Sequence, residues 1–434
     1  MAKPHQVSSL SEQQSQPQRA RTRICYFVHS GGMGGAPLSL LYLLQQLDLE
    51  KYQPVVVFLS ESPLRQAYQR LGIDTMVARG MTYFSHNTGE SLSLRNPRGW
   101  LHVPMYLTRV WQTNHLVRRL RPQIVHLNSS TLAAQAIGAK LVGARVVWHI
   151  REHVTDGLLG IRKALLKWVA RHFTDAIIVI LNGDVDRLGA PEKSHVIYNF
   201  VDFKVFDRGL RDHSLVTNER RTSTVVMLGG VSQVKGTLEL VQAYPLVKQK
   251  IGPVRFLVAG YSGLEFLTNR ASTPKRLLRR IFGSYRYVQQ LHTYVQQHCD
   301  QGVVFCGVID DVPHLLAQVD LVVFPSTTPH FARPIVEAGA MAIPVVASDL
   351  EGPRELVRHG ETGLLVPPGD PAALAEAIAR ILADENLAHD MGEAGFAQAQ
   401  RLFRAEANSQ ATFRVYEALL QKPAPTKSGQ DNKP

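Results

Sequence analysis

The feature that most constrains the fold is an alternation of short β-branched runs with longer stretches of helical periodicity. "RICYFVHS" (23–30) is followed by "GGMGGAPLSLLYLLQQL" (31–47), then by "QPVVVFLS" (53–60), and the alternation continues to "DAIIVI" (175–180). Parallel strands need a crossover segment between them, which is usually a helix, so this order is typical of parallel sheets built from βαβ units. We therefore predict an open α/β domain over residues 21–205.

The same alternation restarts after a polar, charged segment. "STVVMLGG" (223–230) leads to a helical pattern, and "VRFLVAG" (254–260) and "DLVVFPS" (320–326) follow it. We predict a second α/β domain over residues 222–400 and a separate C-terminal helix over 401–421. Two domains agree with the chain length of 434 residues, because single cores stop growing at roughly 250 to 300 residues.

The two ends of the chain have a different composition. Residues 1–20 are rich in Gln and Ser, and residues 422–434 read "KPAPTKSGQDNKP". Neither end has the apolar periodicity that a packed element needs, so we predict disordered tails. Between the tails, the patterns predict the α/β fold class with two open domains.

The net charge is +12, yet the basic residues gather in a few amphipathic stretches and no motif of a nucleic-acid-binding fold accompanies them. We expect an anionic ligand or membrane surface as the partner, and no nucleic acid. The start of the chain lacks the apolar core of a signal peptide, and the longest apolar runs are strand-sized. These features predict a soluble, cytoplasmic protein.

The three cysteines, Cys25, Cys299 and Cys306, have neither CxxC nor metal-ligand spacing. Such a set suits a reducing compartment, and we interpret these residues as packing residues. We predict no metal site.

In the first domain, the turn "SGGMGGAPL" (30–38) lies between a strand and a helix, where bare backbone can approach a phosphate. The dinucleotide pattern G-x-G-x-x-G fails, because Gly32 and Gly34 are followed by Pro37 where the third glycine belongs. A dehydrogenase is therefore disfavoured. The alternative that these glycines only form a tight turn stays open.

"WHIREH" closes another strand of this domain and places four polar side chains near its carboxyl end. They are His149, Arg151, Glu152 and His153. A lone histidine is more often structural than catalytic, but four such groups at one strand end indicate a functional edge.

In the second domain, Lys235 lies in the strand-to-helix turn "VSQVKG", at the sheet edge where open α/β folds bind ligands. A lysine there can bind phosphate, or it can be an ordinary solvated lysine. Glu337 follows the loop "TTPHFARP" at the same edge. It can accept both hydroxyls of a ribose, or it can be a first-turn glutamate favoured by the helix dipole.

Two basic amphipathic segments, "LLGIRKALLKWVARHF" (158–173) and "TPKRLLRRIFGSYRYVQQL" (273–291), combine apolar and cationic residues. That composition suits a helix lying on anionic lipid. A helix packed on its own sheet with a solvated basic face is the alternative.

Taken in order, these motifs resemble the retaining GT-B glycosyltransferases of family 4, closest to bacterial members that assemble surface polysaccharides. The resemblance extends over roughly 400 residues, which is far more specific than one motif. The matching pieces are "GGMGGAPLSLL", "VVWHIREH", "VIYNFVD", "GGVSQVKG", "VVFCGVIDDV", "FPSTTPHFARPIVEAGAMAIPVVASD" and "GPRELVRHGETGLLVPPGDP".

The resemblance implies two Rossmann-like, doubly wound domains that face each other across a cleft, with the last helix crossing back to the first domain. It implies sugar transfer from a nucleotide-diphosphate sugar to a glycan or lipid-linked acceptor, with retention of configuration and without a metal or other cofactor. The enzyme would then work in the cytoplasm, peripherally at the inner face of the membrane.

The resemblance also implies roles for individual residues. Lys235 would hold the donor diphosphate, and Glu337 would hold the ribose hydroxyls. His149 would contact the transferring sugar or the acceptor, so His149 and Glu337 are the expected catalytic residues. The backbone would contact the donor at four further positions: Gly34 and Gly35 beside the phosphates, and Gly307 and Val308 beside the base.

Two departures from the family pattern stand out. An arginine usually precedes the lysine, and Gly230 stands there; the first glutamate of the usual E-x7-E pair is Pro329. Arg333 would supply the missing positive charge near the phosphates. The departures motivate an alternative, a degenerate GT-B protein that binds a nucleotide sugar or a partner without transfer. A GT-B epimerase would need a set of catalytic acids that the sequence does not show.

Overall fold

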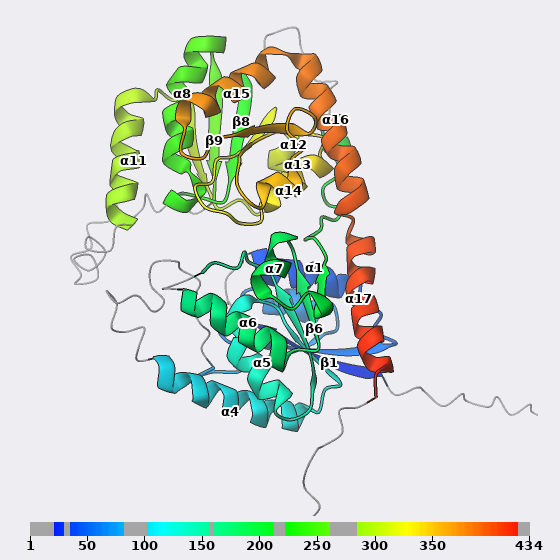
Figure 1. The fold of residues 1–434 in the computed structure, drawn as a ribbon. Coiled ribbons are helices and arrows are strands. Elements are labelled where there is room, and N and C mark those ends of the chain that lie inside the picture. The colour runs from blue at the N-terminus through cyan, green and yellow to red at the C-terminus, as the bar shows by residue number, and fades with distance from the viewer. Residues whose placement is uncertain are drawn as a thin grey trace, which may run out of the picture.

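The structure, a computed structural model, describes residues 21–29, 35–81, 102–156, 160–211, 222–260 and 284–423. It contains two parallel sheets, one in each half of the chain, with helices on both faces of each (Figure 1). The strand orders are β3-β2-β1-β4-β5-β6-β7 and β10-β9-β8-β11-β12-β13. In each sheet the chain winds outward in one direction and then in the other, which confirms the predicted pair of doubly wound domains.

The first sheet is buried on both faces, because helices cover both sides of a parallel sheet. Two apolar clusters, one on each face, form its core. Its strands are β1 (Thr22–Val28), β2 (Tyr52–Phe58), β3 (Asp74–Val77), β4 (Ile124–Leu127), β5 (Arg145–Ile150), β6 (Ala176–Val179) and β7 (Ser194–Val196). Its helices are α1 (Gly35–Gln45), α2 (Arg65–Arg70), α4 (His102–Leu120), α5 (Ala133–Lys140), α6 (Ile161–Phe173) and α7 (Gly183–Leu188).

The second sheet repeats this architecture with its own two apolar clusters. Its strands are β8 (Ser223–Leu228), β9 (Val254–Ala259), β10 (Val303–Gly307), β11 (Leu321–Phe324), β12 (Val345–Ser348) and β13 (Gly363–Val366). Its helices are α8 (Thr237–Ile251), α11 (Ser284–His298), α12 (Val312–Ala317), α13 (Arg333–Ala340), α14 (Pro353–Leu356), α15 (Pro371–Ala383) and α16 (Glu385–Leu402).

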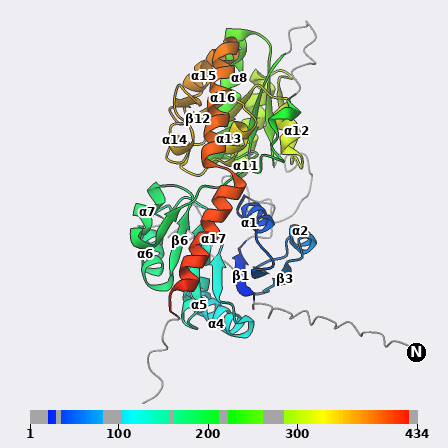
Figure 2. The same cartoon turned by 90° about the vertical axis from the view of Figure 1, so that its right-hand side faces the viewer.

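The last helix, α17 (Ala405–Gln421), crosses from the second domain to the first, as predicted (Figure 2). It follows α16 after a short break, where the backbone N–H of Val201 donates to the carbonyl of Phe403 at 2.9 Å. Phe413 and Tyr416 of α17 belong to the apolar core of the first domain. The two domains therefore share this helix as well as the chain between β7 and β8.

Both sheets change their winding direction beside their first strand, between β1 and β4 and between β8 and β11. Ligands of open α/β sheets bind outside the carboxyl ends of the strands at such a switch point. The loops after β1, β4, β8 and β11 are therefore the places where a site is expected.

Candidate functional site

Lys235 lies in the loop between β8 and α8, at the switch point of the second sheet. Its ammonium nitrogen Nζ is 2.7 Å from Nε2 of His330, which follows β11. Gly236 makes this turn possible: its φ is +73°, and a Cβ there would lie 1.7 Å from the carbonyl oxygen of Pro325. A glycine is therefore required beside the lysine, because any side chain would collide with fixed backbone.

The tautomer of His330 follows from its neighbours. Its Nδ1 lies 2.9 Å from the carbonyl oxygen of Thr328, which can only accept, so Nδ1 carries the proton and Nε2 accepts from Lys235. Burial lowers the pKa of Lys235 to about 8. Burial, and then the charge of Lys235, lower the pKa of His330 to about 4. Near neutral pH the pair is thus a charged lysine held by a neutral histidine.

Glu337 lies on α13, the helix that follows β11, and only 8% of it is exposed. Its Oε1 accepts from Nε of Arg333 at 2.8 Å. Burial raises the pKa of Glu337, and the Arg333 charge and hydrogen bond oppose that shift. Glu337 lies one turn after α13 begins, and not in the first turn that the helix-dipole alternative requires, so stabilisation by the helix dipole does not explain it. Its binding of ribose stays a prediction.

Arg333 also connects the two domains. Its Nη1 donates to Oγ of Ser39 on α1 at 2.9 Å, and its guanidinium lies 5.3 Å from the ring centroid of Tyr42 on the same helix. The start of α1 and the start of α13 therefore meet. This contact brings the switch points of the two sheets together.

The expected catalytic His149 is enclosed near the end of β5, with 1% of the residue exposed. Its ring lies 5.3 Å from the ring of His126, and within the described segments neither ring nitrogen of His149 has a hydrogen-bond partner. Burial lowers the pKa of His149 well below its usual value, and Arg151 and His126 add to that effect. The ring is neutral and covered here, so contact with a sugar or acceptor would need local opening and remains a prediction.

Arg151 and His153 lie just beyond His149, and His153 contacts the second domain. Nε of Arg151 donates to Oδ1 of Asn128 at 3.0 Å, within the first domain. Nδ1 of His153 lies 3.1 Å from Oδ1 of Asp184, and its Nε2 lies 3.9 Å from Oε2 of Glu351 in the second domain. The "WHIREH" segment thus reaches the domain contact, as expected.

Of the four backbone positions expected to contact the donor, three lie within the described residues. Gly35 begins α1, and Gly34 lies outside the described residues. Gly307 ends β10 with a φ of +69°, and its carbonyl accepts from the backbone N–H of Gly260 at 2.6 Å. Val308 is 66% exposed, an unusual place for an apolar side chain that nothing covers. Contact with a base stays a prediction for both residues.

Gly230, which stands where the family has an arginine, has a φ of +76°. Side chains rarely adopt this conformation, so the backbone here favours glycine. Lys235 and Arg333 stay the cations that we predict near the phosphates. The sequence reasoning missed His330. Its position was a signal, because it is a titratable residue directly after Pro329, where the family has a glutamate.

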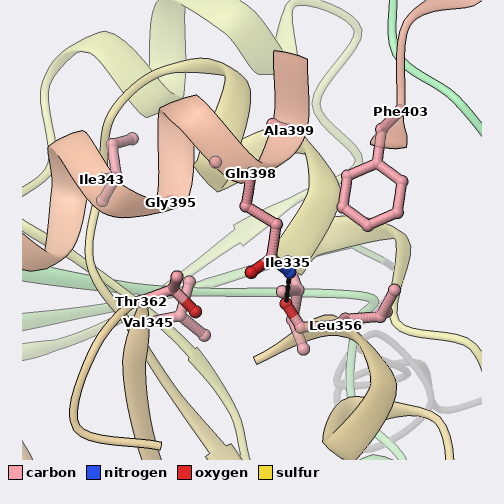
Figure 3. Close-up of a pocket in the computed structure, with 10 residues that line it drawn as sticks. Ile335, Ile343, Val345, Leu356, Thr362, Gly395, Gln398, Ala399 and Phe403 are labelled. Atoms are coloured by element: carbon pink, nitrogen blue, oxygen red, sulfur yellow. Dashed lines mark hydrogen bonds between the residues drawn. The ribbon is translucent and has the colours of Figure 1, made fainter. Parts of the chain in front are cut away.

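Figure 3 shows a small cavity whose lining residues differ from the site residues described above. It has a volume of about 10 Å³ and lies between α13 and α16, lined by residues that include Ile335, Gly339 and Phe403. Nε2 of Gln398 donates to the carbonyl of Leu356 at 2.8 Å beside it. The space suffices for about one water, so this is a packing defect and not a ligand site.

Within the described parts of the chain, no three His, Cys, Asp or Glu residues are grouped so that they could hold a metal ion. Among the helices of those parts, none has the length and apolarity needed to cross a membrane.

Family models match both domains of the chain. Residues 33–205 match the model described as Glycosyltransferase Family 4, and residues 222–384 match the model described as Glycosyl transferases group 1. Together these segments cover most of the chain.

Two curated relatives illustrate the similarity. N-acetyl-alpha-D-glucosaminyl L-malate synthase of Bacillus anthracis is 27% identical over 231 residues, which cover 52% of this chain and 54% of the relative. Phosphatidyl-myo-inositol mannosyltransferase of Mycobacterium leprae is 31% identical over 204 residues, which cover 46% of this chain and 48% of the relative. The chain thus spans about half the length of these relatives.

Solved structures are similar over nearly the whole chain. The Anabaena protein Alr3699/HepE in complex with UDP has a TM-score of 0.71 and 21% sequence identity, covering 92% of this chain and 100% of that one. The same protein in complex with UDP-glucose has a TM-score of 0.70, 22% identity and coverage of 93% and 100%. These likenesses show the fold, and the expected GT-B architecture is confirmed.

Proposed function

The chain belongs to the group 1 and family 4 glycosyltransferases, and on that premise we propose that it moves a sugar from a nucleotide-diphosphate sugar to a glycan or lipid-linked acceptor, with retention of configuration. The observation that carries the proposal is that the switch point of the second sheet holds two cations and a buried carboxylate. Lys235 is bonded to His330 there, and Arg333 is bonded both to Glu337 and to Ser39 of the first domain. Cations and a buried carboxylate there suit a diphosphate and a ribose diol. The solved structures with UDP and UDP-glucose, similar in fold, support this type of donor.

The chemistry follows from where charge develops. The bond between the anomeric carbon and the diphosphate oxygen breaks, and the acceptor oxygen forms the new bond on the same face of the sugar. The acceptor proton leaves with a departing phosphate oxygen. Lys235 and Arg333 stabilise the negative charge that grows on the leaving diphosphate, and preorganised groups of this kind supply much of an enzyme's rate enhancement. Charge from this chain's own side chains suffices, so we propose transfer without a metal, tested by full activity in excess chelator.

The transfer assay decides between this function and binding without catalysis. A panel of nucleotide sugars is first ranked by the shift in melting temperature, because a ligand stabilises the native state by mass action. The best donor is then incubated with lipid-linked and glycan acceptors, and the anomeric configuration of the product is read by NMR. Inverted product contradicts retention. Tight donor binding without any transfer across the acceptor panel supports the degenerate binder.

We also propose that the enzyme works in the cytoplasm, peripherally on anionic membrane, through α6. The buried residues of this helix include Leu166 and Val169, while Ile161 and Trp168 are 49% and 47% exposed beside the exposed Arg171. A mixed apolar and basic face provides both contributions to membrane affinity. The second predicted segment lies outside the described residues up to position 283.

Vesicle co-sedimentation tests this membrane proposal. Wild type should bind phosphatidylcholine vesicles that contain phosphatidylglycerol better than pure phosphatidylcholine vesicles, and salt should weaken the binding. Trp168→Ala should bind less, whereas Trp111→Ala, a matched change of an exposed tryptophan on α4, should bind normally. Equal binding to both vesicle types would refute an electrostatic contribution.

A further inference from the structure

Arg151 is a buried cation held only by neutral groups. Its residue is 6% exposed, and its Nε donates to Oδ1 of Asn128 at 3.0 Å. Its Nη1 donates to Oδ1 of Asn199, and its Nη2 is buried without a hydrogen-bond partner among the residues that the structure describes. No carboxylate in the described parts of the chain forms an ion pair with it. The guanidinium is therefore oriented by amides but is not neutralised.

The arrangement is costly unless something anionic completes it. A buried charge without a counter-ion is strongly unfavourable, and a buried N–H without an acceptor adds to that cost. Burial lowers the pKa of Arg151 to about 9, with Arg333 as the next cause, while Glu152 acts in the opposite direction. Oε2 of Glu152 accepts from the backbone N–H of Ser130 at 2.9 Å, so that oxygen is already engaged.

The second cation near Arg151 comes from the other domain. Arg333 lies close enough to Arg151 to lower its pKa, and it is anchored at this place by Ser39 and Glu337. The arrangement around Arg151 extends to the same helix start, because Nδ2 of Asn128 donates to the carbonyl of Ala36 at 2.8 Å. The guanidinium groups of Arg151 and Arg333 thus both lie near the start of α1. Of these two, Glu337 pairs with Arg333.

We propose that Arg151 and Arg333 form an anion-binding site between the domains that takes a phosphate or carboxylate group of a substrate. The free Nη2 of Arg151 donates to that anion, whose charge relieves the repulsion between the two guanidiniums. The proposal rests on the proposed function for the origin of the anion, which is either the donor diphosphate or an acidic group of the acceptor. An acceptor with a phosphate or carboxylate near its reacting hydroxyl would fit the second case.

Inorganic pyrophosphate is the probe, because its binding needs no knowledge of the base or the sugar. Its affinity is measured by calorimetry for wild type, Arg151→Met and Arg333→Gln, with Arg23→Met as the control. Arg23 is half-buried and bonded to Gln53 and a backbone carbonyl, at the opposite end of β1. We expect each site variant to weaken pyrophosphate roughly 10- to 100-fold, as the loss of a hydrogen bond to a charged group requires. The control should bind normally.

Melting temperature separates a ligand role from a structural role. Removing an uncompensated charge should leave the melting temperature of ligand-free Arg151→Met within about 4 °C of wild type. A much larger drop together with unchanged pyrophosphate affinity would mean that the arginine only supports the fold, and would overturn the proposal. If Arg151→Met does not fold, Arg333→Gln and Arg151→Lys decide, and wild-type affinity in both would overturn it as well.

The affinities for UDP and uridine show whether the donor or the acceptor supplies the anion. If the donor supplies it, Arg151→Met weakens UDP but not uridine, and pyrophosphate competes with UDP. If the acceptor supplies it, UDP affinity is unchanged, pyrophosphate binds to the UDP-saturated protein, and Arg151→Met abolishes that second binding. Loss of pyrophosphate binding in the variants together with no sugar transfer by wild type would reject the proposed function but keep the anion site. Normal sugar transfer by wild type, together with wild-type pyrophosphate affinity in every site variant, would reject the anion site but keep the proposed function.

Discussion

Lys235 should make diphosphate affinity depend on pH in a range where most enzyme–nucleotide contacts do not titrate. Burial lowers its pKa to about 8, whereas a bound anion favours the charged form and returns the pKa toward its usual value of about 10.4. With these values, the affinity for UDP or pyrophosphate should fall about fourfold between roughly pH 7 and pH 8.5. His330 does not contribute there, because its pKa is lowered to about 4.

The assay is calorimetry at several pH values up to about 8.5, below the lowered pKa of Arg151 at about 9. Lys235→Arg is the matched variant, since a guanidinium at this place keeps its charge and should flatten the profile. Uridine is the control ligand, because it has no phosphate. A fourfold fall for uridine, or an unchanged profile in Lys235→Arg, would refute the assignment of Lys235 to the diphosphate.

The same lowered pKa affects ligand-free stability with the opposite sign. The unfolded chain binds the Lys235 proton more tightly than the folded protein between about pH 8 and 10.4, so this residue's contribution to stability rises with pH across that window. The stability of wild type relative to Lys235→Met should therefore increase from about pH 8 to pH 10. A difference that does not change with pH would contradict the burial of the ammonium group.

Further substitutions test the neighbours of this site. Glu337→Gln should weaken nucleoside affinity and turnover roughly 10- to 100-fold, measured by calorimetry and by the transfer assay. The melting temperature should change little, because burial already disfavours the ionised carboxylate. Normal affinity with a large loss of stability would contradict a ligand role. His330→Phe should weaken pyrophosphate binding by removing the hydrogen-bond acceptor for Lys235, and His330→Gln should restore part of that binding. In a Lys235→Ala background the effect of His330→Phe should vanish. Full additivity of the two substitutions would refute the coupling between His330 and Lys235. Tyr416→Ala should lower the free energy of unfolding, measured by denaturant titration, by about 3 to 5 kcal/mol. The reason is that the ring is fully buried and its hydroxyl is hydrogen-bonded to His126 at 2.8 Å. A loss below about 1 kcal/mol would mean that α17 contributes little to the stability of the first domain.

The fold class could be predicted from the sequence, because it depends on apolar runs and turn residues that recur along the chain. Parallel strands buried on both faces appear as runs such as "VVVF" in β2 and "AIIV" in β6, and the turns after them contain the glycines that tight strand-to-helix connections need. The same logic placed Lys235 and Glu337 at one sheet edge, since the carboxyl ends of parallel strands share an edge. The two α/β domains followed from these local signals, whereas their doubly wound arrangement and the crossing of the last helix were expected only from the family resemblance.

Which side chains meet was decided only by the tertiary structure. Arg333 and Ser39 are 294 positions apart, and Lys235 and His330 are 95 apart, so no periodicity along the chain relates them. Apolar runs indicated which strands would be buried, yet they could not show that His149 would be enclosed or that Arg151 would be buried without a counter-ion in the described parts of the chain. Burial and charge pairing depend on how the two sheets approach each other, and that approach is set by the packing of all their helices together, α17 included.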